Sequence, residues 1–197
     1  MDLGATVLEL ADARLPLDAA RVFGTPRPLE VELGVGKGLF LLEWAGAHPE
    51  IGVIGVERAR KYLELAARRA AHRGLANVRL VHTTAEDLLF RCLAPASAAA
   101  VHVYFPDPWP KKRHHKRRFF RAENASRLAD VLAPGGLLRV KTDHEPYAGV
   151  IREVLAAERR LAAVPVDDAF DAVPRTHFEI KYAREERPVY RFAYRRL

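Results

Sequence analysis

Strand-like and helical segments alternate along most of the chain, and this alternation constrains the fold more than any other feature. Five apolar runs have the length of buried strands: residues 29–33, 51–56, 78–81, 98–105 and 137–142. Segments with helical spacing follow them: residues 39–48, 58–73, 84–93, 119–132 and 146–161. When a helix follows each strand, the strands can run parallel in one sheet with helices on both faces. We therefore predict a doubly wound, mostly parallel α/β sheet, closed by strands from the last residues, around 189–194.

The size and composition of the chain fit one globular domain. Its 197 residues, 49% of them hydrophobic, can bury a sizeable core. The strand–helix pattern becomes clear at Leu29, so we predict an N-terminal arm at residues 1–28 and a single domain at residues 29–197. The chain starts without a signal-peptide pattern and has no long apolar run, which predicts a cytoplasmic protein with no membrane partner. Cys92 is the only cysteine, which excludes a disulfide framework or a cysteine-built zinc site, and we predict no metal site.

The positive charge of the chain is concentrated in one segment. The formal net charge is +7, and six Lys or Arg residues lie between positions 111 and 118. No acidic residue occurs from position 108 to position 122. Concentrated positive charge indicates a polyanionic partner such as a nucleic acid. The plainer interpretation is a solvated surface helix, which is what most basic segments are.

This basic segment follows a stiff loop at the end of a predicted strand. Pro106, Pro108 and Pro110 fix the backbone and stop the strand. They present Asp107 and Trp109 at one end of the sheet, where α/β proteins hold ligands. A carboxylate, a flat ring and nearby cations suit the binding of a nucleobase and the neutralisation of its phosphates. Packing of the ring beneath the loop is the alternative for Trp109.

A second ligand-binding pattern lies at the first strand-to-helix turn. Gly34 and Gly36 would let a ligand approach the backbone at the start of a helix. Glu57 follows the second strand, where a carboxylate can accept both hydroxyls of a ribose. Glu32 would repel a pyrophosphate but suits an ammonium group, and S-adenosylmethionine carries an amino-acid tail and no phosphate. The same acid and the G-x-G-x-G spacing disfavour a nicotinamide dehydrogenase.

Five motifs follow one another along the chain: V-E-L-G-V-G-K-G at 31–38, G-V-E at 55–57, F-P-D-P-W-P-K-K-R-H-H-K-R-R at 105–118, T-D-H-E-P-Y at 142–147 and T-H-F-E at 176–179. Together they strongly resemble the tRNA (guanine-N(7)-)-methyltransferase family. The resemblance implies a single-domain class I fold with a seven-stranded Rossmann-like sheet, with S-adenosylmethionine as cofactor and tRNA as partner. It also implies methylation of nitrogen 7 of a variable-loop guanosine. We expect a monomer or a homodimer.

The resemblance implies roles for individual residues. Asp107 is the expected catalytic residue and also a cofactor contact. The other expected cofactor contacts are Glu32, Gly34, Gly36, Glu57, Thr84, Ala85 and Glu86. The expected substrate contacts are Lys111, Asp143, Thr176, His177, Phe178 and Glu179. The expected RNA-facing residues are Arg113, His114, His115, Lys116, Arg117 and Arg118. Relatives often have an acid where this chain has Thr84, so the adenine contact can fall to any residue from 84 to 86.

The chemistry of the expected reaction suits these residue types. Nitrogen 7 of guanine has an in-plane lone pair and no proton, so its methylation requires alignment and no general base. Asp107, Asp143 and Glu179 are the carboxylates we expect to stabilise the positive charge on the purine and to accept hydrogen bonds from guanine. Local patterns also allow structural interpretations. Asp143 could cap the next helix, and Thr176 with Glu179 fits a capping box.

Two other functions fit the same residues. The D-P-W-P sequence is similar to the loop with which nucleic-acid methyltransferases orient an exocyclic amine. An RNA-binding protein that keeps a relic cofactor pocket would also carry the glycine loop and the basic segment. Mapping of the methylated atom distinguishes the first alternative from methylation of nitrogen 7. Methyl transfer from labelled cofactor distinguishes an enzyme from the second alternative.

Overall fold

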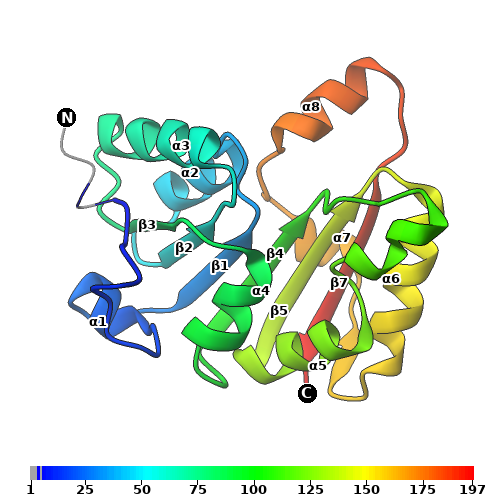
Figure 1. The fold of residues 1–197 in the computed structure, drawn as a ribbon, viewed down its shortest axis with the longest axis horizontal. Helices are drawn as coiled ribbons and strands as arrows, with labels where there is room; N and C mark the ends of the chain where they lie inside the picture. The colour runs from blue at the N-terminus through cyan, green and yellow to red at the C-terminus, as the bar shows by residue number, and fades with distance from the viewer. Residues whose placement is uncertain (1–3, 5) are drawn as a thin grey trace.

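The computed structural model describes residue 4 and residues 6–197, and these residues form a seven-stranded sheet with helices on both faces (Figure 1). The strands are β1 (Leu29–Leu33), β2 (Gly52–Val56), β3 (Val78–Val81), β4 (Ala98–Tyr104), β5 (Leu132–Thr142), β6 (Leu161–Ala163) and β7 (Tyr190–Arg196). Their order across the sheet is β3-β2-β1-β4-β5-β7-β6. Neighbours from β3 to β5 pair in parallel, and β7 is antiparallel to β5 and β6. The predicted doubly wound, mostly parallel sheet is confirmed.

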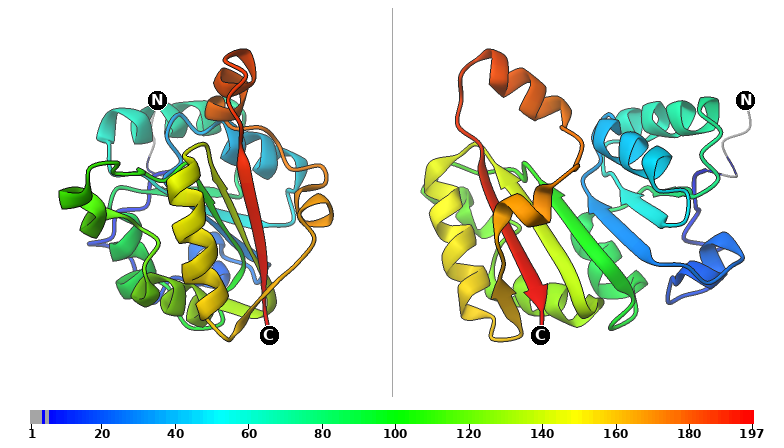
Figure 2. Two further views of the ribbon diagram at one scale, coloured as in Figure 1. Left: turned by 90° about the vertical axis from the view of Figure 1, so that its right-hand side faces the viewer. Right: turned by 180° about the vertical axis from the view of Figure 1, so that it is seen from behind.

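The helical segments between these strands form two covering layers. They are α1 (Ala19–Phe23), α2 (Leu39–Ala47), α3 (Arg60–His72), α4 (Ala85–Asp87), the π-helical turn η1 (Leu88–Cys92), the 3-10 turn η2 (Lys112–Arg117), α5 (Ala122–Val131), α6 (Glu145–Ala157), α7 (Val166–Phe170) and α8 (His177–Arg184). Apolar residues of η1, α5 and α6 pack on one face of the sheet, and those of α2, α3 and α7 pack on the other. Figure 2 shows α7 lying across β5 and β7 in the view from behind.

The central strands are buried along their whole length because both faces of the sheet are covered. The face under α2 nevertheless carries a row of polar side chains. Glu30 Oε2 accepts a hydrogen bond of 2.8 Å from Trp44 Nε1 and lies 2.7 Å from His102 Nε2. The other ring nitrogen of His102 lies 2.9 Å from the Tyr104 hydroxyl. Each buried polar group in this row has a partner, which gives His102 a structural role.

The observed elements differ from the predicted ones where glycine or a short segment intervenes. β5 begins at Leu132, five residues before the predicted start, because residues 133–136 form an irregularity within the strand instead of a connecting loop. Gly136 permits this irregularity, since a Cβ there would lie 2.8 Å from the carbonyl oxygen of Ala133. The helix predicted at 146–161 ends at Ala157, and β6 begins at Leu161, the last residue of the predicted helix. The sequence predicts neither α1 nor α7, and it indicates α8 through the capping box of Thr176 and Glu179 alone.

The N-terminal residues described here extend the sheet at its β3 edge. The backbone of Leu80 accepts a hydrogen bond from Leu8 and donates one to Thr6, each 2.8 Å long. Leu17 is buried and its N–H donates to the carbonyl of Cys92. The start of the chain therefore packs on the sheet from residue 6, and the boundary at residue 28 stays a prediction. Within the described residues, we find no helix with the length and apolarity that a membrane span requires.

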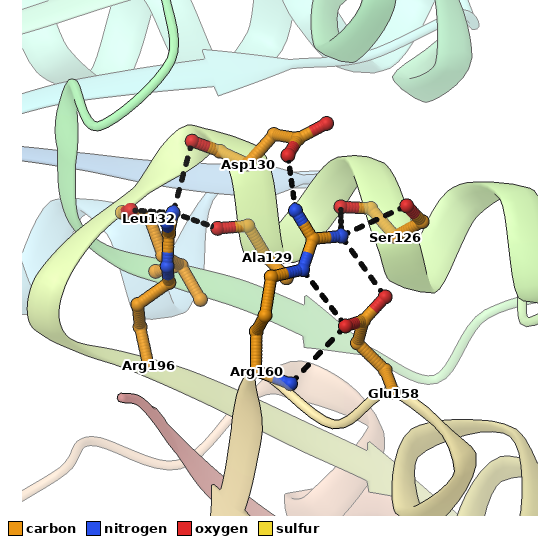
Figure 3. Close-up of polar contacts among 7 residues, drawn as sticks. All are labelled: Ser126, Ala129, Asp130, Leu132, Glu158, Arg160 and Arg196. Carbon is orange, nitrogen blue, oxygen red and sulfur yellow. Dashed lines mark hydrogen bonds and ion pairs between the residues drawn. The ribbon is translucent and has the colours of Figure 1, made fainter.

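An arginine cluster fastens the C-terminal strands to α5 at the amino-terminal edge of β5 (Figure 3). Arg160 pairs with Asp130 and donates to Glu158, with a distance of 2.8 Å from its Nε to Glu158 Oε1. Arg196 donates to the carbonyls of Ala129 and Leu132. This cluster lies at the end of the sheet opposite the ligand-binding edge, so we assign it a structural role.

Candidate active site

A cavity of about 600 Å³ opens at the carboxyl edge of the sheet, where the strand order reverses between β1 and β4. Open α/β sheets hold their ligands at such a switch point. Its lining comes from the ends of β1, β2 and β4, from the segments that follow β1, β2, β3 and β4, and from α8: Leu33, Gly34, Gly36, Val56, Glu57, Arg58, Ala59, Tyr62, Thr83, Thr84, Ala85, Glu86, Val103, Tyr104, Phe105, Pro106, Asp107, Trp109, Arg117, Phe119 and Phe178. The glycine loop and the proline loop, 70 residues apart in the sequence, therefore share one cavity.

The glycine loop folds tightly between β1 and α2. Gly34, Gly36 and Gly38 all have positive φ angles, of 87°, 53° and 80°. At Gly38 a Cβ would also lie 2.9 Å from the Cβ of Ala66, so α3 packs directly on the loop. Only glycine meets both demands without strain. The loop carries no side chain that would keep a ligand away from its backbone at positions 34 and 36.

Two acids lie beside this loop in different environments. Glu57 lines the cavity, and its carboxylate accepts hydrogen bonds from Gly36 N (2.9 Å) and Ala59 N (2.7 Å), which hold it in place. Glu32 is buried next to the cavity, and its Oε2 has no hydrogen-bond partner. Burial, and then the negative charge of Glu57, raise the pKa of Glu32 well above its usual range, while Lys141 opposes the shift. An unpartnered buried carboxyl oxygen is costly, and a cation brought to it would relieve the cost.

Residues 83–86 form the wall beyond β3. The Thr84 hydroxyl accepts a hydrogen bond from Asp87 N and caps α4. Thr84, Ala85 and Glu86 all line the cavity, so each of the three predicted adenine contacts lies where such a contact is possible.

The proline loop holds Asp107 between two backbone positions that are unusual for their residue types. Phe105 and Trp109 have positive φ angles of 53° and 42°. Non-glycine residues in this region cost on the order of 1–3 kcal/mol each and collect at functional sites. The strained turns leave Asp107 exposed and facing the cavity.

Arg118 anchors this loop from beneath, which corrects its predicted place on the RNA-facing surface. Its side chain is buried, its Nε donates to the Pro108 carbonyl at 2.8 Å, and its guanidinium lies 4.9 Å from the centre of the Tyr147 ring. The 3-10 turn ends at Arg117, and the extended backbone at Arg118 directs that side chain inward. Sequence spacing alone does not reveal that the Arg118 side chain points inward while its basic neighbours are exposed.

The rest of the basic segment forms an exposed strip over η2. We define the η2 basic strip as Lys111, Lys112, Arg113, Lys116 and Arg117, all exposed. Arg117 also lines the cavity and lies 4.9 Å from the centre of the half-buried Trp109 ring. His114 packs edge-on against the same ring, and His115 lies near the Pro110 carbonyl. Trp109 therefore packs within the strip and also presents part of its ring to the cavity.

The predicted substrate residues of 176–179 divide into two groups. Thr176 and Glu179 form the capping box of α8, with bonds of 3.1 and 2.9 Å, and Glu179 also accepts a 2.9 Å bond from Lys141 Nζ. Both acid and lysine are buried, and neither lines the cavity. Phe178 does line it, is 48% exposed, and packs against Phe105 with 5.5 Å between ring centres. The capping interpretation describes Thr176 and Glu179, and Phe178 is the member of this motif at the cavity.

The charge state of the buried pair follows from its contacts. Burial would raise the pKa of Glu179, but the hydrogen bonds from Lys141 and from the Thr176 N–H outweigh it and lower the pKa. Burial is likewise the main reason that the pKa of Lys141 is lowered. The Lys141 ammonium also lies 4.6 Å from the Tyr104 ring centre. Lys141 was missed from the sequence, although a lysine inside the apolar run at 137–142 is the signal that could have identified it.

Asp143 is not the helix cap that its position suggested. His144 caps α6 instead, because its Nδ1 accepts from Tyr147 N. The Asp143 carboxylate forms an ion pair with Arg187, which follows α8. It therefore links the end of β5 to the segment after α8, outside the cavity lining.

The chain matches known methyltransferases along most of its length. Residues 26–192 match the family model Methyltransf_4, described as "Putative methyltransferase". A tRNA (guanine-N(7)-)-methyltransferase of Thiobacillus denitrificans is 40% identical over 192 residues, covering 96% of this chain and 84% of the relative. One of Mycobacterium avium is 42% identical over 169 residues, covering 84% of this chain. This chain spans 65% of the length of that relative and of its counterpart from Mycolicibacterium paratuberculosis.

Solved structures show the same fold at low sequence identity. The aminoglycoside resistance methyltransferase NpmB1 has a TM-score of 0.58 with 22% identity, covering 89% of this chain and 90% of that one. A crystal structure described as an antibiotic related methyltransferase has a TM-score of 0.60 with 15% identity, covering 92% and 96%. The sheet described above is therefore that of class I methyltransferases.

Proposed function

The chain belongs to the tRNA (guanine-N(7)-)-methyltransferase family, and we propose that it transfers the methyl group of S-adenosylmethionine to nitrogen 7 of a guanosine in the tRNA variable loop. The observation that carries the proposal is that the glycine loop and the proline loop line the same cavity. The first is suited to a nucleoside with an amino-acid tail, and the second to a nucleobase beside a cationic strip. We place the enzyme in the cytoplasm, where tRNA is modified.

The residues beside the glycine loop fit S-adenosylmethionine. The unpartnered Glu32 carboxyl lacks a cation, which an amino-acid ammonium would supply directly or through water. Gly34 and Gly36 leave space for the tail, Glu57 would bind the ribose hydroxyls, and the wall at residues 84–86 would enclose the adenine. When bound, this cofactor supplies a methyl group activated by its sulfonium.

On the other side of the cavity, the protein has to hold a guanine still and tolerate the charge that forms on it. Asp107 is the carboxylate that faces the cavity from this side, and it would stabilise the positive charge that develops on the purine. Its strained, anchored loop fixes its position before substrate arrives, which is the requirement for alignment. The half-exposed Phe178 ring offers a face on which the base can stack. Lys111 is a further substrate contact in this proposal, to a phosphate, and Asp143, which pairs with Arg187 outside the cavity lining, is a substrate contact beside the cavity.

Thr176 and Glu179 contribute differently from the way their motif suggested. Their oxygens are occupied by the capping box and by Lys141, so we assign them to holding α8, and with it Phe178, beside the cavity. His177, the first residue of α8, is an outer contact for RNA. The η2 basic strip, with His114 and His115 beside it, would bind the RNA backbone, mostly independently of sequence.

The test is mass spectrometry of tRNA nucleosides after incubation with methyl-labelled S-adenosylmethionine. We expect labelled 7-methylguanosine with the wild-type chain, and at least a hundredfold slower formation with Asp107→Ala. Reduction and aniline treatment should then cleave the tRNA at one position in its variable loop. Labelled tRNA that resists this cleavage would instead support methylation of an exocyclic amine. No label at all would support an RNA-binding protein with a relic cofactor pocket.

A further inference from the structure

A second basic surface lies on α3, beside the cavity. α3 follows Arg58 and carries Tyr62, and both residues line the cavity on the side of β2. Figure 1 shows α3 and α8 near the carboxyl edge of the sheet. We define the α3 basic surface by its exposed cations: Lys37, Arg60, Lys61, Arg68, Arg69 and Arg73.

The acids near this surface do not balance it. Glu64 is shared by Arg60 and Arg68, at 3.0 and 3.3 Å, and Glu43 pairs with Arg73 at 2.8 Å. Within the described part of the chain, Lys37, Lys61 and Arg69 have no acidic partner. Glu43 is exposed and Glu64 half-buried, and the arginines that pair with them are exposed, so these ion pairs are screened and contribute little to stability. RNA phosphates could therefore replace these glutamates as partners of the arginines at little cost in free energy.

The surface continues from α3 to the start of α8. Arg69 donates a 2.9 Å bond to the carbonyl of Lys37, which places the Arg69 guanidinium beside the backbone of Lys37. His177 lies within reach of their charge: partial burial, then Arg69 and Lys37, lower its pKa. The positive field thus reaches across the outer part of the site to the helix that carries Phe178.

Two separate cationic surfaces therefore border one cavity. Arg117 brings the η2 basic strip to its rim on the side of β4, and Arg58 brings the α3 basic surface to its rim on the side of β2. A backbone segment bound to one of these surfaces leaves the other available for a second segment. A folded RNA can present two backbone segments at once.

We propose that the α3 basic surface binds a second segment of the tRNA backbone, separate from the segment held by the η2 basic strip. This inference rests on the proposed function. It adds that recognition uses two separate backbone segments, which a folded tRNA can present on both sides of the cavity.

The test neutralises two α3 cations that lie outside the cavity lining. The double variant Lys61→Gln/Arg68→Gln should raise the apparent KM for a tRNA transcript and leave kcat at saturating tRNA unchanged. The log–log salt dependence of kcat/KM should lose up to about 0.9 per phosphate contact removed. A matched control, Arg14→Gln/Arg159→Gln, removes two other exposed positive charges, one before α1 and one after α6, and should leave both quantities unchanged.

Two further measurements keep the result interpretable. Thermal unfolding should show that both double variants fold, since all four side chains are exposed. Affinity for S-adenosylhomocysteine should be unchanged, because none of the four lines the cavity. If Lys61→Gln/Arg68→Gln leaves KM and the salt dependence at wild-type values while Arg117→Gln alters both, the α3 basic surface is only solvated and the inference is wrong. If the wild-type chain methylates no tRNA, the proposed function itself fails.

Discussion

Replacing Lys141 with methionine should leave the buried carboxylate of Glu179, in α8, without its lysine partner. Lys141 and Glu179 are 2% and 5% exposed, and 2.9 Å separates Nζ from Oε2. Breaking a buried pair by removing one partner typically costs about 3–5 kcal/mol. A domain of this kind has a total unfolding free energy of roughly 5–15 kcal/mol, so Lys141→Met should remain folded but be markedly less stable. Arg191 approaches the other oxygen at 3.5 Å but is 47% exposed, so it replaces little of the loss.

The dependence of this loss on pH follows from the pKa of Glu179. In the wild type that pKa is lowered from 4.5, so the carboxylate contributes stability that is present above about pH 4.5 and is lost as the pH falls through the lowered pKa. Without Lys141, burial dominates and raises the pKa of Glu179 above 4.5. The contribution of Glu179 to the stability of the variant is then most favourable at low pH and falls as the pH rises through the raised pKa. The difference between the two proteins should therefore grow from about pH 4.5 to pH 7.

A double variant separates the charge from the packing. Lys141→Met/Glu179→Gln has no unpaired charge, and its amide oxygen can still accept from the Thr176 N–H. We expect it to be about 2 kcal/mol more stable than Lys141→Met at pH 7. Its loss of stability should also not show the increase with pH that is expected for Lys141→Met. Lys181→Met is the matched control, because Lys181 pairs with Glu185 on the same helix but at the surface, 3.7 Å apart. It should change the unfolding free energy by less than about 0.5 kcal/mol.

The assay is urea-induced unfolding followed by far-UV circular dichroism at several pH values. A loss in Lys141→Met that is below about 1 kcal/mol and equal at all pH values would refute the reasoning. The reasoning would also be refuted if the double variant were as unstable as the single one. The loss would then come from the lost packing of Lys141 against Tyr104 and Phe170.

Three other predictions concern the cavity and its loop. Asp107→Asn should lower kcat at least about a hundredfold while the affinity for S-adenosylhomocysteine, measured by calorimetry, stays within about threefold; equal losses of both would contradict a role in catalysis. Because the pKa of Glu32 is raised in the free protein, binding of the cofactor ammonium should release a proton, and affinity should rise with pH. Calorimetry in two buffers of different ionisation enthalpy should detect that proton, and Glu32→Gln should abolish it. Arg118→Ala should lower the unfolding free energy by about 1–3 kcal/mol, as loss of a buried hydrogen bond implies, whereas Arg117→Ala should leave stability unchanged and raise the KM for tRNA.

The sequence was most informative where chemistry and periodicity coincide. The apolar run at 98–105, ended by Pro106, predicts β4 because a strand buried on both faces needs apolar residues throughout, and proline cannot extend it. Gly34 and Gly36 indicate the ligand-binding loop because few other residues tolerate that backbone. The position of Glu57 follows from these two features, since the carboxyl ends of parallel strands meet at one edge of a sheet.

The sequence was least informative where a side chain could point either way. Arg118 has five basic neighbours within seven residues, and nothing in the pattern shows that the chain turns it inward toward Pro108. The local pattern of Thr176 and Glu179 allowed a cap or a substrate contact. The deciding partner, Lys141, lies 38 residues from Glu179 and is brought to it only by the pairing of β5 with its neighbours. Such long-range pairs depend on tertiary structure and leave no local pattern.

The account depends on one cavity that serves both the cofactor and the base. A crystal structure with S-adenosylhomocysteine tests this most directly. We predict that the ligand occupies the cavity with its ribose at Glu57 and its amino group toward Glu32, and that the Asp107 carboxylate faces the sulfur, where the methyl group would be. A ligand bound elsewhere, or an Asp107 directed away from the sulfur across the sheet, would contradict the account.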